Sequence, residues 1–274
     1  MTESVTGLLD RCEEAARTGL GAKIKIEDET SFPDPASLHI AVPRWKRVFD
    51  VVAVVGDMKN STALSFREHP KTSARIYEAM TGNMVRVLDH YEPDFVDIQG
   101  DGVFGLFHGN AALERGLCAA ISLTTFSRLR LKPMIEALLP PEVPDTGIKT
   151  GMAFGTLTAK RIGIRGTEEP VWAGKPVNWA VKCAQAADAH ELVVTSRVWE
   201  HFKTNDWVVW SCGCVDGIPS DSVKTLWKTA LVSALANEAC RKLESYWCPR
   251  CGDEFHEAIL QGETKRADLG ENIA

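Results

Sequence analysis

The sequence predicts an α+β fold in which helices pack over a sheet that contains antiparallel strand pairs. Three features indicate this fold. Residues 47–56 are rich in valine, which is typical of a fully buried strand. Residues 71–90 repeat apolar side chains at helical spacing. Residues 94–107 contain two short strand-like runs around a Gly-Asp-Gly turn, the pattern of a hairpin.

The remaining elements follow from the same periodicities. A helix at 6–18 and a proline-containing extended stretch precede the buried strand. After the hairpin we expect a helix at 111–130, a strand at 148–154, strand-like residues at 156–164, a loop, a helix at 177–190, strands at 191–196, 207–211 and 223–232, and a short helix after Ser233. We therefore expect an N-terminal helical and extended arm at 1–44, one domain at 45–232, and a short cysteine-containing extension at 233–274.

Composition limits the classes of function. The 274 residues are 45% hydrophobic and 25% charged, as in ordinary globular proteins. A formal net charge of -6 argues against a protein that binds nucleic acid through a broad basic surface. No apolar run approaches the roughly 18 residues of a membrane span, and the N-terminus lacks the pattern of a secretory signal. We expect a cytoplasmic protein whose paired cysteines favour metal over disulfides.

Two aspartates stand where strands end or turn. Asp57 follows the buried strand and precedes a turn-prone segment whose backbone N–H groups could cradle phosphates. Asp101 lies in the Gly-Asp-Gly turn. If the two strands are neighbours, the carboxylates form a clamp for two divalent cations, as in phosphoryl transfer. The alternative for either aspartate alone is an ordinary turn or helix-capping role.

Four segments in order resemble the class III nucleotidyl cyclases: "FDVVAVVGDMKNSTALS", "VDIQGDGVFGLF", "IKTGMAFGTLTAKRIG" and "GKPVNWAVKCAQAAD". The resemblance spans about residues 47–232. It implies a class III cyclase-like sandwich with a central, mostly antiparallel sheet flanked by helices. It also implies that Asp57 and Asp101 bind the two metal ions, Mg²⁺ or Mn²⁺, with the carbonyl of Met58 as a further ligand. The residues implied to bind the triphosphate are Lys59, Asn60, Ser61 and Thr62.

The resemblance assigns further roles to a helix and a late strand. Asn178 matches the asparagine that orients the ribose. Lys182, one helical turn later, replaces the arginine that usually stabilises the transition state; it keeps the charge but not the bidentate fork. Lys224 falls near a lysine that contacts the terminal phosphate. In such cyclases a head-to-tail homodimer shares each site, and the ribose 3′-hydroxyl attacks the α-phosphate to release pyrophosphate.

The residues that would select the base depart from the purine patterns. Asp97 stands where a purine cyclase has lysine or glutamate, and the partner position falls on Val171, or on Pro170 with one gap. This departure resembles the Pycsar pyrimidine cyclases of bacterial antiphage defence, whose cyclic UMP or cyclic CMP activates a separate effector. We favour UTP over CTP. The alternatives are an adenylate or guanylate cyclase with an atypical base pocket, an inactive cyclase-homology dimerisation module, and an Asp97 that only caps the hairpin or pairs with a cation.

The cysteine-containing extension offers a metal site of another kind. Cys212 and Cys214, with Cys248 and Cys251 of "WCPRCG", could supply four thiolates to one structural zinc ion, and His256 or Cys240 could replace a member. The alternative is buried free thiols. "CGDEF" resembles the GGDEF signature of diguanylate cyclases, but it follows the cysteine knuckle where no such hairpin can form, so we reject that assignment.

Overall fold

The computed structural model describes residues 4–40, 42–67, 70–164 and 166–269 and divides the chain into two compact units. The larger unit comprises Asp50–Thr156 and the chain from Gly174 onward. The smaller comprises the chain up to Phe49 and Leu157–Ala173. Two 15-residue strands, β2 (Arg44–Met58) and β5 (Ile148–Ile162), contribute to both units.

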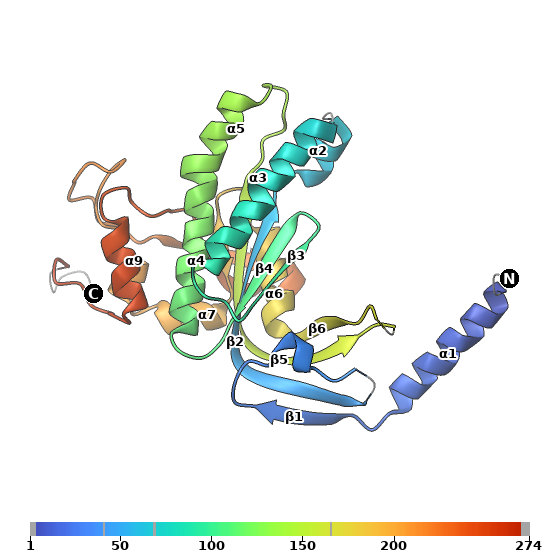
Figure 1. Ribbon diagram of the computed structural model, residues 1–274. Helices are drawn as coiled ribbons and strands as arrows, with labels where there is room; N and C mark the ends of the chain where they lie inside the picture. Colours follow the sequence, from blue (N-terminus) through green and yellow to red (C-terminus); the bar gives the residue numbers. More distant parts are fainter. Residues whose placement is uncertain (1–3, 41, 68–69, 165, 270–274) are drawn as a thin grey trace. The chain divides into compact units, whose positions relative to one another are not determined.

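A sheet forms the centre of the larger unit (Figure 1). Its order is β3-β4-β2-β5-β7-β9-β8. The other strands are β3 (Phe95–Gln99), β4 (Gly102–Phe107), β7 (Leu192–Val194), β8 (Trp227–Val232) and β9 (Glu238–Leu243). The pairs β2–β4, β3–β4, β7–β9 and β8–β9 are antiparallel, whereas β5–β7 is parallel. The predicted α+β class with a largely antiparallel sheet is confirmed.

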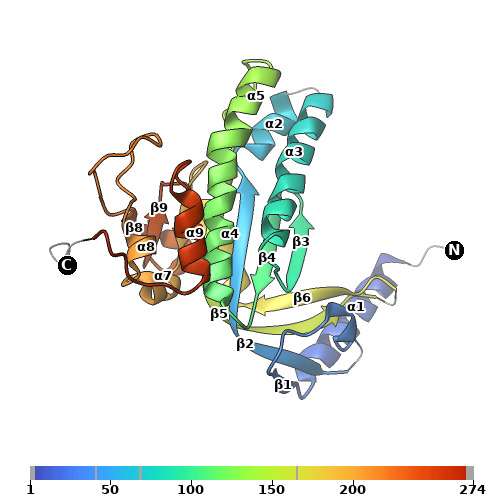
Figure 2. The same cartoon turned by 60° about the vertical axis from the view of Figure 1, so that its left-hand side comes forward.

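Helices cover both faces of this sheet. The helices of the larger unit are α2 (Ser61–Arg67), α3 (Pro70–Asp89), α4 (Ala112–Phe126), α5 (Lys132–Leu138), α6 (Lys175–Ala186), α7 (Ser196–Phe202), α8 (Asp206–Val209) and α9 (Gly252–Leu260). Helices α3 and α4 lie against one face, and α9 packs beside α4 (Figure 2). On the other face α6 packs against β7, burying Cys183 and Ala187 with Val193.

Strand alternation explains why the central strands are apolar throughout. In β7, Leu192 and Val194 join the core under α3 and α4, whereas Val193 joins the cluster under α6. Successive side chains of a strand point to opposite faces, so a strand covered on both sides needs apolar residues at every position. The same reasoning accounts for the valine-rich part of β2, where 51–55 are all buried.

The smaller unit contains the helix α1 (Val5–Gly21), the strands β1 (Lys25–Glu29) and β6 (Glu169–Gly174), and a short 3-10 turn at Pro35–Ser37. Strand β1 runs parallel to the start of β2, and β6 pairs with β5. The Ser4 side chain caps α1 by accepting from the Gly7 amide. Phe32 packs on Trp172 with ring centroids 5.0 Å apart.

Several sequence predictions were wrong in detail. The strand expected at 207–211 is the helix α8, which Asn205 caps by accepting from the Trp207 amide. The stretch 148–164 contains one long strand, β5, without a break at Gly155. Strands β1, β6 and β9 were not expected. The chain enters β9 through Ala236 and Asn237, both in the left-handed region, without the glycine that usually marks such a turn.

No described helix is long and apolar enough to cross a bilayer. The predicted boundaries at 44/45 and 232/233 stay predictions, although β9, which lies beyond 233, belongs to the central sheet.

Candidate active site

The two predicted metal-binding aspartates lie on neighbouring strands. Strand β2 pairs with β4 so that Gly56 is opposite Val103, which places Asp57 opposite Gly102 and beside the turn that carries Asp101. A Cβ atom at Gly102 would lie 3.8 Å from Asp57 Oδ1 and 3.4 Å from the Gly56 carbonyl oxygen. Glycine at this position therefore leaves free the space beside the Asp57 carboxylate. Both aspartates are half-buried.

Asp57 also has a cationic partner that the sequence analysis did not identify. Lys149 Nζ lies 2.5 Å from Asp57 Oδ2, and the two side chains are 17% and 26% exposed. Lys149 comes from β5, the strand next to β2. Its flanking residues Ile148 and Thr150 are fully buried on the opposite face. A lysine within the predicted strand at 148–154 was visible in the sequence, but its pairing with Asp57 was not.

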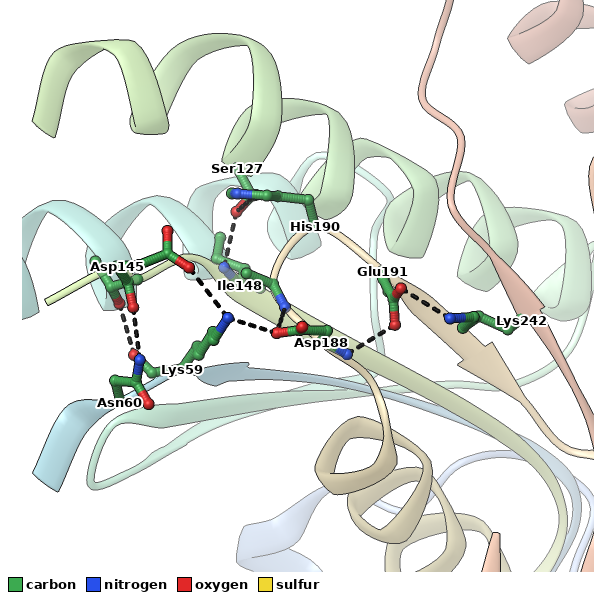
Figure 3. Close-up of polar contacts among 11 residues, drawn as sticks. Lys59, Asn60, Ser127, Asp145, Ile148, Asp188, His190, Glu191 and Lys242 are labelled. Atoms are coloured by element: carbon green, nitrogen blue, oxygen red, sulfur yellow. Dashed lines mark hydrogen bonds and ion pairs between the residues drawn. The ribbon is translucent and has the colours of Figure 1, made fainter. Parts of the chain in front are cut away.

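The segment after β2 is fastened to residues 145–147 (Figure 3). The Lys59 amide donates to the Gly147 carbonyl at 2.9 Å, and the Asn60 side chain donates to the Asp145 carbonyl at 2.7 Å. The buried Thr146 hydroxyl donates to the Lys59 carbonyl at 2.7 Å. Of the amides predicted to cradle phosphate, that of Lys59 is thus already bonded within the chain. The helix α2 begins at Ser61, the next residue along.

The Lys59 side chain binds two carboxylates other than those of Asp57 and Asp101. Its ammonium lies 2.7 Å from Asp188 Oδ1 and 3.1 Å from Asp145 Oδ2. Hydrogen bonds to Asp188 and then to Asp145 raise the pKa of Lys59, and the bond to Lys59 lowers the pKa of Asp188. Lys59 therefore joins the loop after β2 to the loops before β5 and β7.

His190 and Ser127 support the start of β5. The Ile148 amide donates to Ser127 Oγ at 2.7 Å, and Ser127 Oγ lies 2.8 Å from His190 Nδ1 (Figure 3). Ser127 and His190 therefore share a hydrogen bond whose direction depends on the tautomer of the ring. A Cβ atom at Gly147 would lie 2.6 Å from His190 Cε1, so only glycine fits beside the ring. Burial, ahead of the nearby positive charges, lowers the pKa of His190.

Asp97 lies in the edge strand β3, opposite Phe104 of β4. Its Oδ1 accepts a hydrogen bond from the amide of the next residue, Ile98, at 2.9 Å. The side chain is half-buried. Pro170 and Val171, the other residues predicted to select the base, lie in β6 within the smaller unit.

Asn178 and Lys182 project from α6 one turn apart. Asn178 is exposed, and Lys182 donates to Gln185 at 3.1 Å. Helix α6 has a proline in its first turn. The helix packs directly on β5 at Gly151, because a Cβ atom on residue 151 would collide with the Ala180 carbonyl oxygen of α6. Among the residues that the structure describes, neither Asn178 nor Lys182 hydrogen-bonds to Asp57 or Asp101.

Lys224 lies before β8, where its amide donates to Ser211 Oγ at 3.0 Å. In the sheet order, β8 is separated from β2 by β5, β7 and β9. Lys224 instead lines a cavity of about 440 Å³ together with Cys212, Cys214 and Cys248. Within one chain the structure thus groups it with the cysteines, and its contact with a terminal phosphate stays a prediction.

The four cysteines expected to bind zinc do come together. In Cys212, Cys214, Cys248 and Cys251 the Sγ atoms all lie within 4.8 Å of one another. We call this group the cysteine cluster. The substitutes considered from the sequence are engaged elsewhere: Cys240 is buried in the core cluster that contains Cys183, and His256 Nε2 lies 2.9 Å from the Tyr91 hydroxyl.

Comparison with known proteins places these features in context. No family model matches the chain. It is 38% identical to a uridylate cyclase of Micromonospora echinofusca over 98% of this chain and 88% of that protein. It is 40% identical to a uridylate cyclase of Propioniciclava tarda over 96% of this chain and 86% of that protein. The fold is similar to the crystal structure of the adenylyl cyclase CyaB from P. aeruginosa, with a TM-score of 0.55 and 16% identity over 73% of this chain and 94% of that one.

Proposed function

Because the chain belongs to the uridylate cyclase family, we propose that it converts UTP to 3′,5′-cyclic UMP with release of pyrophosphate. The chain has the class III nucleotidyl cyclase fold. The observation that carries the proposal is the position of Asp57, at the end of a buried strand and opposite the Gly-Asp hairpin that carries Asp101. A pair of carboxylates at neighbouring strand ends is the arrangement that phosphoryl transfer assisted by two metal ions requires.

The residues present fit two divalent cations, Mg²⁺ or Mn²⁺. Hard cations prefer oxygen ligands, and Asp57, Asp101 and the Met58 carbonyl would supply them. The Lys149 ammonium that lies against Asp57 shows that this carboxylate accommodates a positive charge. When bound, such cations lower the pKa of the ribose 3′-hydroxyl and neutralise charge on the phosphates.

The protein side chains would bind and orient the nucleotide. The 3′-hydroxyl would give up its proton to solvent water, and the 3′-oxygen would form its bond to the α-phosphorus as the bond from that phosphorus to the pyrophosphate oxygen breaks. Asn178 would hydrogen-bond the ribose so that the 3′-oxygen stands in line with the leaving group. Lys182 would stabilise the negative charge that develops on the α-phosphate oxygens. Asn60, Ser61 and Thr62 would contact the triphosphate, with Lys59 holding their loop in place.

The two halves of the site come from different subunits in this proposal. Asn178 is exposed on α6, and within one chain it makes no described hydrogen bond to Asp57 or Asp101. A head-to-tail homodimer would bring the α6 residues of one subunit to the aspartates of its partner, and would create two equivalent sites.

Asp97 can bind a pyrimidine, whereas the choice of a pyrimidine over a purine rests on the uridylate cyclase relatives. An ionised carboxylate accepts hydrogen bonds only, and uracil offers a donor at N3–H. Cytosine offers its amino group, so CTP is the alternative pyrimidine substrate. A purine substrate with an atypical base pocket remains the second enzymatic alternative. We further propose that the cyclic nucleotide acts in the cytoplasm as a second messenger of antiphage defence, read by a separate effector protein.

Incubation of the purified protein with each of the four ribonucleoside triphosphates tests the activity. Reactions contain Mg²⁺ or Mn²⁺, and products are identified by mass spectrometry. Cyclic UMP as the main product supports the proposal. Cyclic CMP as the main product would correct the base, cyclic AMP or cyclic GMP alone would exclude a pyrimidine cyclase, and no cyclic product would favour the inactive dimerisation module.

A further inference from the structure

The cysteine cluster lies outside the nucleotide site and has the composition of a closed metal centre. Its members come from two segments far apart in sequence: Cys212 and Cys214 follow α8, whereas Cys248 and Cys251 precede α9. Cys214 Sγ and Cys251 Sγ are 3.7 Å apart, far beyond a disulfide bond. Four sulfur atoms at such separations match the edges of a tetrahedron around one ion with metal–sulfur bonds of about 2.3 Å.

A tight turn joins the first two cysteines of the cluster. Gly213, between the first two cysteines, has φ of +82°, and a Cβ atom there would lie 2.5 Å from the Ser220 carbonyl oxygen.

The second segment continues directly into contacts with α4. The Trp247 amide donates to Thr125 Oγ1 at 3.0 Å, and its indole N–H donates to Ser122 Oγ at 2.9 Å. Helix α9 then packs beside α4 (Figure 2). The cluster therefore joins the loop between α8 and β8 to the point where the C-terminal segment docks on the helix that covers the central sheet.

We propose that the four cysteines bind one structural zinc ion, which clamps the segment before α9 to the loop before β8. Four thiolates fill the tetrahedral shell, so the ion has no open position and no part in the reaction. Its role is mechanical. It holds Trp247 and α9 against α4, in a region where the loop at 211–225 has little regular structure of its own.

Metal analysis of the protein as purified tests the site without reference to cyclase activity. Elemental analysis should find about one zinc per chain in the wild type and a loss of it in Cys248→Ser. The matched control is Cys12→Ser, which removes an exposed thiol on α1 and should keep the zinc. Cys248→Ser should also lower the midpoint of thermal unfolding by roughly 5 °C or more, and should speed proteolysis near α9.

A spectroscopic measurement on the wild type covers the case in which Cys248→Ser does not fold. Protein produced in cobalt-supplemented medium should show the intense visible bands of tetrahedral cobalt and the ultraviolet charge-transfer band of thiolate ligation. The zinc proposal is overturned if wild type from zinc-supplemented medium lacks zinc or contains iron in its place. It is equally overturned if Cys12→Ser loses the metal, or if the cobalt spectrum lacks the thiolate band.

Discussion

Lys149 Nζ lies 2.5 Å from Asp57 Oδ2, so the aspartate at the end of β2 carries its own counter-ion within the chain. Both side chains are largely shielded from water, which makes this pair stronger than an exposed ion pair. In the proposed enzyme a divalent cation and the ammonium would compete for the same carboxylate. The ion pair thus holds the Asp57 side chain in place when no nucleotide is bound.

Replacement of this ammonium should change the affinity for metal. Lys149→Met leaves Asp57 without a competing cation, and we expect manganese to bind about 3- to 10-fold more tightly in the absence of nucleotide, equivalent to ~0.6–1.4 kcal/mol. Titration calorimetry with Mn²⁺ measures this directly. Lys149→Arg keeps the charge and should bind manganese as the wild type does. Weaker binding by Lys149→Met would show that the lysine assists the metal rather than competing with it.

Complementation between two inactive variants should reveal a shared site. Asp57→Ala and Asn178→Ala should each be inactive as homodimers. A mixture that exchanges subunits yields half heterodimers, each with one intact and one doubly altered site, so activity should recover to about a quarter of the wild-type value. The measurement is cyclic nucleotide formation after mixing. Dimers that exchange subunits, shown by affinity-tag pull-down, but stay inactive would contradict the shared site.

Asp97 should discriminate between bases through its charge. Asp97→Asn has the same shape but can present a donor as well as an acceptor. We expect kcat/KM for UTP to fall about 10- to 100-fold, or ~1.4–2.7 kcal/mol. We expect kcat/KM for CTP to change less than kcat/KM for UTP. An unchanged ratio of the two substrates would show that Asp97 does not discriminate between the two bases.

His190 should make the stability of the fold depend on pH. Burial, with the charges of Lys132, Arg128 and Lys59 opposed by Asp145, lowers the pKa of His190 in the folded protein below the ordinary value of about 6.5. The neutral ring, which is hydrogen-bonded to Ser127, therefore contributes stability above about pH 6.5, and this contribution is lost as pH falls through the lower folded value.

His190→Asn is the matched variant for this test. Residue 190 has φ of +65°, which asparagine tolerates, and an amide oxygen can still accept from Ser127. The drop in thermal midpoint between pH 7.5 and 5.5 should be a few degrees smaller in His190→Asn than in the wild type. A variant whose midpoint falls as steeply as that of the wild type would assign the acid sensitivity to other groups.

The site residues that could be predicted from the sequence are those whose positions depend on the chain immediately around them. Asp57 could be predicted because a buried strand ends there, and Asp101 because Gly-Asp-Gly turns are recognisable. The cysteine cluster was predictable from its paired spacing. In each case the signal lies within a few residues of the side chain concerned.

Features that depend on distant contacts were not predictable. Lys149 and Asp57 are joined because β2 and β5 are neighbours, which no local pattern reveals. The contacts of the Lys59 ammonium were not predicted either, because Asp145 and Asp188 reach it from loops remote in sequence. Strand β9 was missed because its apolar positions are few and its turn uses Ala236 and Asn237 in place of glycine.

The contact of α6 with β5 at Gly151 limits how the enzyme can be retuned. Because the backbones meet where a side chain would stand, any larger residue at 151 would lift the helix as a rigid body and move Asn178 and Lys182 together. A substitution at Gly151 therefore cannot move Asn178 without also moving Lys182. Variation in substrate geometry would have to come from the side chains themselves or from the way that two subunits meet.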